Sequence, residues 1–293
     1  MAAPAPDVAL HRLNGAAFGG SFLLASSDED DLPRAAAVLD EFERTLSRFR
    51  SDSALARLNR EGRLAAPPPL LVACLQAAQE AALFTNGLVD ATILPSLEAA
   101  GYDRTFADVR DGAGGSLSPH RPVTGRIRIS ERAVELPRGC RVDLGGVAKG
   151  LAVDHALAAM RGTRALVNAA GDVRVRGGGF AVDLQVLPDA RHPLDTTVRL
   201  DGGALATSGV TRRHWVGPDG ACRHHLIDPR TGAPADSPWL VVTVWAPTCL
   251  EADVRAKEAF LLGADAPARL TELGLAGRLI GRDGTAVGAG AWA

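Results

Sequence analysis

The spacing of hydrophobic residues predicts three helices in the first third of the chain. An acidic run at 28–31 opens the first helix, since negative side chains suit the partial positive charge of a helix N-terminus. A short second helix is expected over 52–59, and a third, introduced by three prolines, over 67–84. The residues that recur at helical intervals in the first helix are Leu32, Leu39, Phe42, Leu46 and Phe49.

Later segments are predicted to be mostly strands. Helices are expected among them over 147–160 and 252–262, and the stretch 108–125, rich in Gly, Pro and Ser, is expected to be a surface loop. Because strands run together and helices cluster near the front, the pattern predicts an α+β fold in a single domain, 1–293. The predicted strands are 11–26 with an interruption at 18–20, 126–129, 133–136, 165–175, 180–186, 196–200, 240–246 and a last pair within 278–292.

Composition and charge exclude several classes of protein. The net charge is −2 and no basic block occurs, so nucleic-acid binding is not expected. The 4 cysteines are scattered without a CxxC pair, which argues against structural zinc. No apolar run reaches the ~18 residues of a membrane span, and the N-terminus lacks the regions of a signal peptide. These features predict a cytoplasmic protein.

A pair of glycines separates Asp143 from the helix predicted over 147–160. Gly145 and Gly146 would let the backbone approach a ligand closely, and the free N–H groups of the helix start would then suit a diphosphate. Lys149 adds a cation in the first helical turn, where the helix dipole disfavours one unless it meets an anion. The alternative is a tight strand–helix turn with a solvated lysine.

Two further motifs give weaker evidence for a phosphate site when each is taken alone. Thr207 and Ser208 precede a glycine, in a turn whose hydroxyls would bind phosphate or ribose oxygens, or simply satisfy the turn itself. Asp253 and Lys257 are four residues apart on a predicted helix and share a face. They are either a surface ion pair or a carboxylate and an ammonium that point into a phosphate site.

The segment His225–Gly232 combines an imidazole, a carboxylate, a hydroxyl and a rigid Pro-x-x-Gly turn. His225 and Asp228 would serve as a general base and its orienting partner, and Thr231 would cap the turn or contact phosphate. The alternative is a structural turn in which Asp228 and Thr231 satisfy backbone groups and His225 is merely exposed.

Short motifs follow one another in a recognisable order along nearly the whole chain. They are Phe18-Gly19-Gly20, Leu46-Ser47-Arg48-Phe49 with Asp52-Ser53 and Leu58-Asn59, Thr85 to Thr92 with Pro95, Gly101-Tyr102-Asp103, Asp143 to Gly150 with Asp154, Asn168 to Asp172, Thr207-Ser208-Gly209, and His225 to Gly232. In this order they resemble the ApbE family, the FAD:protein FMN transferases.

The resemblance implies a T-fold-like α+β domain, with a mixed or antiparallel sheet, that binds FAD in an extended groove. It also implies a reaction. A Thr or Ser hydroxyl of an acceptor protein attacks the FMN-side phosphorus of FAD, AMP leaves, and FMN stays attached through a phosphoester. Such a transfer depends on positioning and charge neutralisation more than on covalent catalysis.

The resemblance also implies roles for individual residues. The diphosphate would lie at the glycine pair, a magnesium ion would be held by the carbonyl of Ala148 and by Asp253, and His225, oriented by Asp228, would be the base. The flavin end would contact the Asp90–Thr92 turn or the region of Tyr102. The implied cofactor contacts are Asp90, Thr92, Tyr102, Asp143, Gly145, Gly146, Lys149, Thr207, Ser208, Thr231 and Lys257.

The chain departs from the family pattern on the late helix. The family has a hydroxyl residue four positions after the aspartate, where this chain has Lys257, and a protonated ammonium cannot coordinate a metal. Lys257 is therefore expected to contact the diphosphate or Asp253 and to weaken or displace the magnesium ion. Two alternatives stay open: hydrolysis of FAD to FMN and AMP, and non-catalytic FAD binding or flavin delivery.

Overall fold

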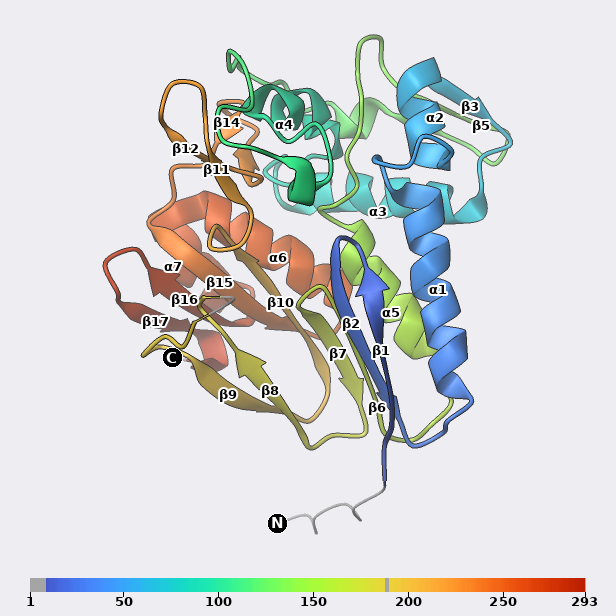
Figure 1. Ribbon diagram of the computed structural model, residues 1–293, viewed down its shortest axis with the longest axis vertical. Helices are drawn as coiled ribbons and strands as arrows, with labels where there is room; N and C mark the ends of the chain where they lie inside the picture. Colours follow the sequence, from blue (N-terminus) through green and yellow to red (C-terminus); the bar gives the residue numbers. More distant parts are fainter. Residues whose placement is uncertain (1–8, 188–189, 293) are drawn as a thin grey trace.

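Alternating apolar residues build an eight-stranded sheet in which all neighbouring strands are antiparallel (Figure 1). The computed structural model describes residues 9–187 and 190–292. In sheet order the strands are β1 (His11–Ala17), β2 (Gly20–Ser26), β6 (Ala165–Ala169), β7 (Asp172–Arg176), β10 (Gly203–Gly209), β15 (Trp239–Ala246), β16 (Ala276–Gly281) and β17 (Ala286–Ala289).

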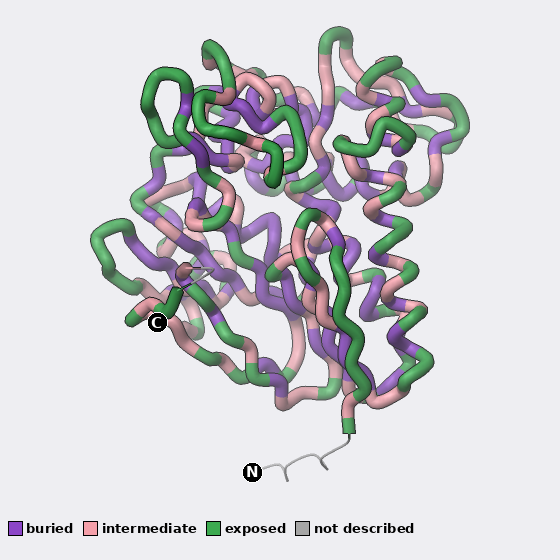
Figure 2. Tube along the Cα trace, in the orientation of Figure 1, coloured by how far each residue is buried: buried purple, intermediate pink, exposed green. Residues whose placement is uncertain are grey.

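Helices α1 (Asp31–Leu46), α5 (Ala148–Ala159) and α6 (Cys249–Leu262) pack against one face of this sheet. Their buried side chains and the inward residues of the central strands form the main core, which Figure 2 shows in purple. The hairpin of β8 (Phe180–Leu184) and β9 (Thr196–Leu200) closes a smaller apolar cluster on the opposite face. The sheet therefore separates two cores, and a residue's place in a strand decides which core it joins.

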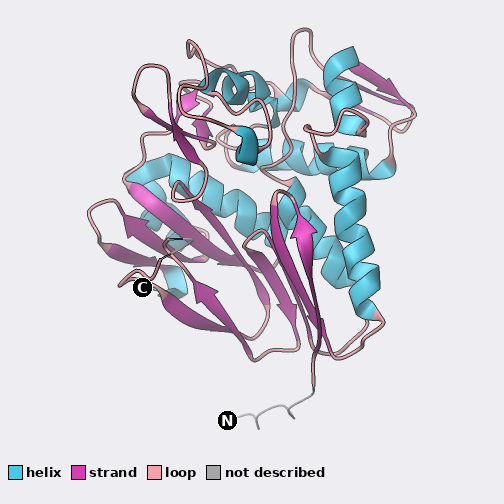
Figure 3. Ribbon diagram, in the orientation of Figure 1, coloured by secondary structure: helices cyan, strands magenta, loops and turns pink. Residues whose placement is uncertain are grey.

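Shorter elements gather at one end of the sheet, at the top of Figure 1. Small two- and three-stranded ladders and short helices alternate there with loops, as the colours of Figure 3 make clear. These elements are α2 (Ala54–Glu61), β3 (Arg63–Ala65), α3 (Pro69–Phe84), α4 (Leu94–Ala100), β4 (Arg128–Ile129), β5 (Ala133–Glu135), β11 (His214–Val216), β12 (Cys222–His224), β13 (Ile227–Asp228) and β14 (Ala233–Pro234). Helix α7 (Ala266–Glu272) packs beside β16 and β17.

The predicted α+β class is confirmed, and of the mixed or antiparallel sheet that the resemblance implies, the structure has the antiparallel form. The loop over 108–125 is also confirmed, except that 3₁₀ turns occupy its two ends at Phe106–Asp108 and Thr124–Arg126. None of the helices in the described ranges is long and apolar enough to cross a membrane.

Three expectations for the secondary structure were wrong. The single strand expected over 165–175 is the hairpin β6–β7, because Ala170 and Gly171 adopt left-handed backbone angles that fold the chain back. Helices α4 and α7 were not anticipated, since each is only two turns long and begins at or beside a proline. The segment containing Thr207 and Ser208 is not a turn but the second half of strand β10.

Candidate functional site

Two lysines and two aspartates meet where α5, β7 and α6 approach one another. We call Lys149, Asp172, Asp253 and Lys257 the lysine–aspartate cluster. Lys149 Nζ donates to Asp172 Oδ2 and lies 3.4 Å from Asp253 Oδ2, while Lys257 Nζ lies 3.4 Å from Asp253 Oδ1. Asp172 and Asp253 are 1% and 2% exposed. Asp253 is thus a buried carboxylate held between two ammonium groups.

Asp154 fixes the relative position of the two helices that carry the cluster. Its two carboxylate oxygens accept hydrogen bonds from the backbone N–H groups of Cys249 and Leu250, at 2.8 and 3.0 Å, and thereby cap the start of α6. Gly150 allows the close approach, because a Cβ there would lie 2.6 Å from the Cys249 carbonyl oxygen. Asp253 is therefore held in register with the first turn of α5.

The charges of the cluster stabilise one another. Burial alone would raise the pKa of Asp253, but the adjacent Lys149 and Lys257 ammonium groups outweigh it and hold the pKa below its ordinary value. Burial would lower the pKa of Lys149, yet Asp172 and Asp253 raise it, so this lysine stays charged. For Asp172, burial together with the neighbouring Asp253 raises the pKa to about 6.

The glycine pair lies directly beside the cluster. Lys257 Nζ donates to the carbonyl oxygen of Gly146 at 3.0 Å. Asp143 holds the turn from the other side, since its Oδ1 accepts from Gly145 N at 2.8 Å and its Oδ2 lies 2.6 Å from Arg48 Nε. The predicted proximity of the turn, Lys149 and the late helix is thus present in the structure.

The carbonyl that faces the late helix belongs to Gly146 and not to Ala148. Ala148 is the first residue of α5, and the carbonyl groups of a helix point along its axis toward the C-terminus. Gly146 precedes the helix, so its carbonyl is free to turn toward Lys257. The carbonyl expected from the family resemblance to bind a metal is that of Ala148, whereas the one that Lys257 contacts is that of Gly146.

An aromatic wall adjoins the glycine turn through Arg48. The Arg48 guanidinium lies 4.1 Å from the ring centre of Phe49 and 4.7 Å from that of Tyr102, and it donates to the Tyr102 carbonyl at 2.7 Å. Phe49 is 39% exposed, whereas Tyr102 is 8% exposed. Phe49 thus presents the accessible ring, and Tyr102 supports it from behind.

His225 is half-buried, in the cationic part of the site. Burial first, and the positive charge of Arg213 second, lower its pKa well below the ordinary value, so the imidazole is neutral at pH 7. Its Nδ1 is buried and has no hydrogen-bond partner of ordinary geometry among the described residues, although the Arg213 backbone lies beside the ring. A neutral imidazole keeps one nitrogen lone pair that is able to accept a proton.

The structure does not bring Asp228 to His225. Arg230 occupies both oxygens of the Asp228 carboxylate, with Nε at 2.9 Å from Oδ1 and a terminal nitrogen at 2.8 Å from Oδ2. Arg230 also donates to the Leu261 carbonyl at the end of α6. The Thr231 hydroxyl accepts from Ala233 N within the same turn. Asp228 and Thr231 therefore hold the β13–β14 turn, as in the structural alternative.

The side chains of Asp90 and Thr92 also make hydrogen bonds within the protein. Asp90 Oδ1 accepts from the Thr92 backbone at 2.6 Å, from the Thr92 hydroxyl at 2.6 Å and from the Thr124 hydroxyl. Burial would raise the pKa of Asp90, but these hydrogen bonds and His120 lower it. The turn supports the site indirectly, because the Ala91 carbonyl accepts from Asp143 N.

Thr207 and Ser208 point to opposite faces of the sheet, because successive strand residues alternate. The Thr207 hydroxyl lies 2.9 Å from that of Thr243 on the neighbouring strand, on the same side as Leu205 and the β8–β9 hairpin. Ser208 shares the helix face with Ala206. The two hydroxyls therefore cannot bind one phosphate together.

Sequence reasoning missed three residues of the site. Arg48 and Asp172 lie inside quoted motifs but were given no role, and their partners became visible only in three dimensions. Arg213 lies in a loop without any local signal, yet its charge acts on Tyr102, Lys149 and His225. A terminal nitrogen of Arg213 donates to the Phe18 carbonyl at 3.3 Å, which ties this loop to the turn between β1 and β2.

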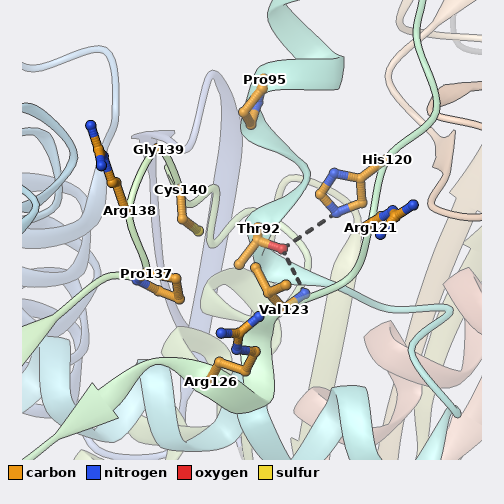
Figure 4. Close-up of a pocket in the computed structure, with 10 residues that line it drawn as sticks. All are labelled: Thr92, Pro95, His120, Arg121, Val123, Arg126, Pro137, Arg138, Gly139 and Cys140. Carbon is orange, nitrogen blue, oxygen red and sulfur yellow. Dashed lines mark hydrogen bonds between the residues drawn. The ribbon is translucent and has the colours of Figure 1, made fainter.

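A separate pocket of about 360 Å³ lies beside the Asp90–Thr92 turn (Figure 4). Thr92, His120 and Cys140 face it, with arginines at its margin. None of the lysine–aspartate cluster lines this pocket. The cluster and the glycine turn, which join the matched motifs, identify the candidate site instead.

The model of the ApbE family matches residues 19–278. FAD:protein FMN transferase of Salmonella typhimurium is 30% identical over 234 residues, covering 73% of this chain and 66% of that protein. The enzyme of the same name from Treponema pallidum is 32% identical over 254 residues, covering 77% of this chain and 69% of the other.

Solved structures share the fold. The ApbE protein of Thermotoga maritima superposes with a TM-score of 0.84 at 23% identity, covering 96% of this chain and 97% of that one. The apo form of the Pseudomonas stutzeri flavinyl transferase ApbE gives a TM-score of 0.79 at 21% identity, covering 96% and 95%.

Proposed function

Because the chain belongs to the ApbE family, we propose that it is an enzyme that transfers the FMN moiety of FAD to a Thr or Ser hydroxyl of an acceptor protein, with release of AMP. One observation carries the proposal. Within the matched part of the chain, the buried Asp253 lies between two lysines; one of them, Lys257, also contacts the glycine turn, and its charge acts on the neutral His225. That set suits the positioning and charge neutralisation that phosphoryl transfer requires.

The proposed step breaks the phosphoanhydride bond of the FAD diphosphate and makes one phosphoester bond. The acceptor hydroxyl oxygen bonds to the FMN-side phosphorus, and the bond from that phosphorus to the bridging oxygen breaks. AMP leaves with the bridging oxygen and its electron pair, while the hydroxyl proton moves to His225. The cations Lys149, Lys257 and Arg213 surround this part of the site and offset the charge that develops on the phosphates.

His225 is proposed to accept that proton without an orienting carboxylate. Its neutral form at pH 7 supports the role, because a protonated imidazole could not take up the acceptor's proton. Asp228 acts at most as a positioning residue, since Arg230 holds its carboxylate. Phe49, with Tyr102 behind it, is the surface that we propose contacts the flavin end, in place of Asp90 and Thr92.

An incubation with FAD and a candidate acceptor protein tests the function. Mass spectrometry is expected to detect the acceptor with one added FMN, and chromatography to detect an equal amount of AMP. FMN and AMP formed equally well without an acceptor would favour hydrolysis. Bound FAD that yields no AMP with any acceptor would favour a flavin-delivery protein.

The residues present do not fit an ordinary magnesium site. A hard divalent cation requires several oxygen ligands. Within the ranges that the structure describes, no group of three His, Cys, Asp or Glu side chains could hold a metal, so a magnesium ion would depend on Asp253 together with carbonyl and phosphate oxygens. Asp253 is the carboxylate expected for that purpose, and both of its oxygens face ammonium groups. No step above therefore passes through a metal ion.

A further inference from the structure

The lysines of this chain have an uneven distribution. Among 32 Lys and Arg residues the only lysines are Lys149 and Lys257, and both contact Asp253. Arginine is used everywhere else, including the surface. A guanidinium is planar and broad, whereas an ammonium is a compact charge that fits a narrow site. The two lysines therefore stand where this chain requires a small cation.

Lys257 contacts the two oxygens that would otherwise face a metal ion. Its Nζ lies 3.0 Å from the Gly146 carbonyl oxygen and 3.4 Å from Asp253 Oδ1. A tetrahedral ammonium has three N–H donors, so two are directed at these oxygens and one remains for a ligand. The side chain is 18% exposed, which leaves the charge accessible from the site.

The cluster is already balanced in charge. Two ammonium groups face the two carboxylates of Asp172 and Asp253. A divalent cation placed between Asp253 and the Gly146 carbonyl would lie against Lys257 Nζ, and like charges at contact distance repel strongly in a buried site. Either the metal or the Lys257 ammonium can occupy this position, but not both.

We propose that the Lys257 ammonium takes the place of a divalent metal ion, so that this protein binds and processes FAD without one. This inference rests on the proposed function. The free N–H of Lys257 contacts the FAD diphosphate directly. Replacing Lys257 with threonine removes the ammonium and supplies a hydroxyl oxygen beside Asp253 and the Gly146 carbonyl. That single change is expected to create a metal site and a metal requirement.

The first test measures metal binding without FAD. Electron paramagnetic resonance of Mn²⁺ is recorded with wild type, Lys257→Thr and Lys257→Met. Wild type and Lys257→Met are expected to leave Mn²⁺ free at concentrations where Lys257→Thr binds it. The methionine variant is the matched control, because it removes the charge but supplies no oxygen ligand. Tight Mn²⁺ binding by wild type would overturn the inference.

The second test measures FAD binding through flavin fluorescence, with EDTA and with Mg²⁺. Wild type is expected to bind equally in both. Lys257→Met is expected to bind roughly 10- to 100-fold more weakly in both, the loss of one charge-assisted hydrogen bond. Lys257→Thr is expected to bind weakly in EDTA and to recover with Mg²⁺.

The outcomes separate the two proposals. Wild-type affinity that collapses in EDTA and returns with Mg²⁺ overturns the role of Lys257 and leaves FMN transfer standing. Equal affinities of wild type and Lys257→Met also overturn that role. Failure of wild type to bind FAD under both conditions overturns the proposed function and, with it, this inference.

Discussion

The lysine–aspartate cluster and the β13–β14 turn each contain a carboxylate paired with cations, but the cations come from different parts of the chain. In the turn, Asp228 is held by Arg230, only two residues away, and both belong to the same short segment. In the cluster, Asp253 is held by Lys149 and Lys257, which come from two helices and lie beside a glycine turn. A carboxylate satisfied within its own segment shapes that segment, whereas Asp253 also binds a lysine of another helix and so brings cations from two elements together for a ligand.

His225 is the one residue of the turn segment that belongs functionally with the cluster. His225→Ala is expected to slow FMN transfer by about 10²- to 10⁴-fold, the usual contribution of a positioned general base. FAD affinity is expected to stay within a few-fold, since the remaining cations are untouched. Single-turnover transfer and fluorescence titration measure the two quantities. A variant that transfers FMN at the wild-type rate would place the base elsewhere.

Asp253→Asn provides the direct comparison with the turn. It removes the buried carboxylate that two half-buried ammonium groups share, although Lys149 keeps Asp172 as a partner, so the free energy of unfolding is expected to fall by up to about 3 kcal/mol. Transfer is expected to drop by roughly 100- to 1000-fold, as for the loss of one preorganised charge. Urea denaturation and the transfer assay are the measurements. A stable, active Asp253→Asn protein would show that the cluster is not the site.

His224, in strand β12 just before the β13–β14 turn, is expected to make the free energy of unfolding depend on pH. Burial first, and the charge of Arg282 later, lower the pKa of His224 to about 4, against 6.5 in the unfolded chain. Above pH 6.5 both states are neutral and stability is full; as pH falls from 6.5 to about 4 the unfolded chain gains the proton first. The loss is expected to reach about 3 kcal/mol.

Urea denaturation at pH 7 and at pH 4.5, for wild type and His224→Gln, measures this effect. His224 accepts from Leu226 N and lies 3.1 Å from the Ala235 carbonyl oxygen, contacts that an amide can approximate. The variant should be less pH-sensitive than wild type over this range, with His225 supplying the remaining slope. An identical slope in both proteins would remove His224 as the cause.

Asp228→Asn is expected to have the smallest effect. Arg230 is 59% exposed in its side chain, and a partly exposed ion pair contributes no more than about 1 kcal/mol. Transfer is expected to stay within a few-fold of wild type, because His225 does not depend on this carboxylate. A loss as large as that of Asp253→Asn would erase the distinction between the two regions and restore Asp228 as a catalytic partner.

The fold was largely predictable because its long elements have strong periodicity. The spacing of Leu39, Phe42 and Leu46 required a helix, and α1 contains all three. The hairpin at Ala170 was not predictable in the same way, since a left-handed alanine has no local signal. The elements that sequence reasoning missed, α4 and α7, are too short for a period to develop.

The sequence predicted which segments form the candidate site, but it predicted less well which side chains and carbonyl groups meet there. Adjacent hydroxyls such as Thr207 and Ser208 look like a pair in one dimension, yet a strand places them on opposite faces. The contact between Lys257 and the Gly146 carbonyl was not predicted, because the direction of a backbone carbonyl just before a helix cannot be read from spacing. Whether Asp228 would meet His225 or Arg230 depended on side-chain directions that no spacing encodes.

The distribution of lysine has a practical consequence for covalent labelling. Apart from the α-amino group, the side-chain amines of the chain are those of Lys149 and Lys257, 19% and 18% exposed. An acylating reagent such as a succinimidyl ester would therefore find side-chain amines only at this one place, where the ion pairs keep Lys149 protonated and slow its reaction. Attachment to a sensor through these lysines would, for the same reason, block that place, whereas the exposed Cys222 offers a thiol that is not part of the lysine–aspartate cluster.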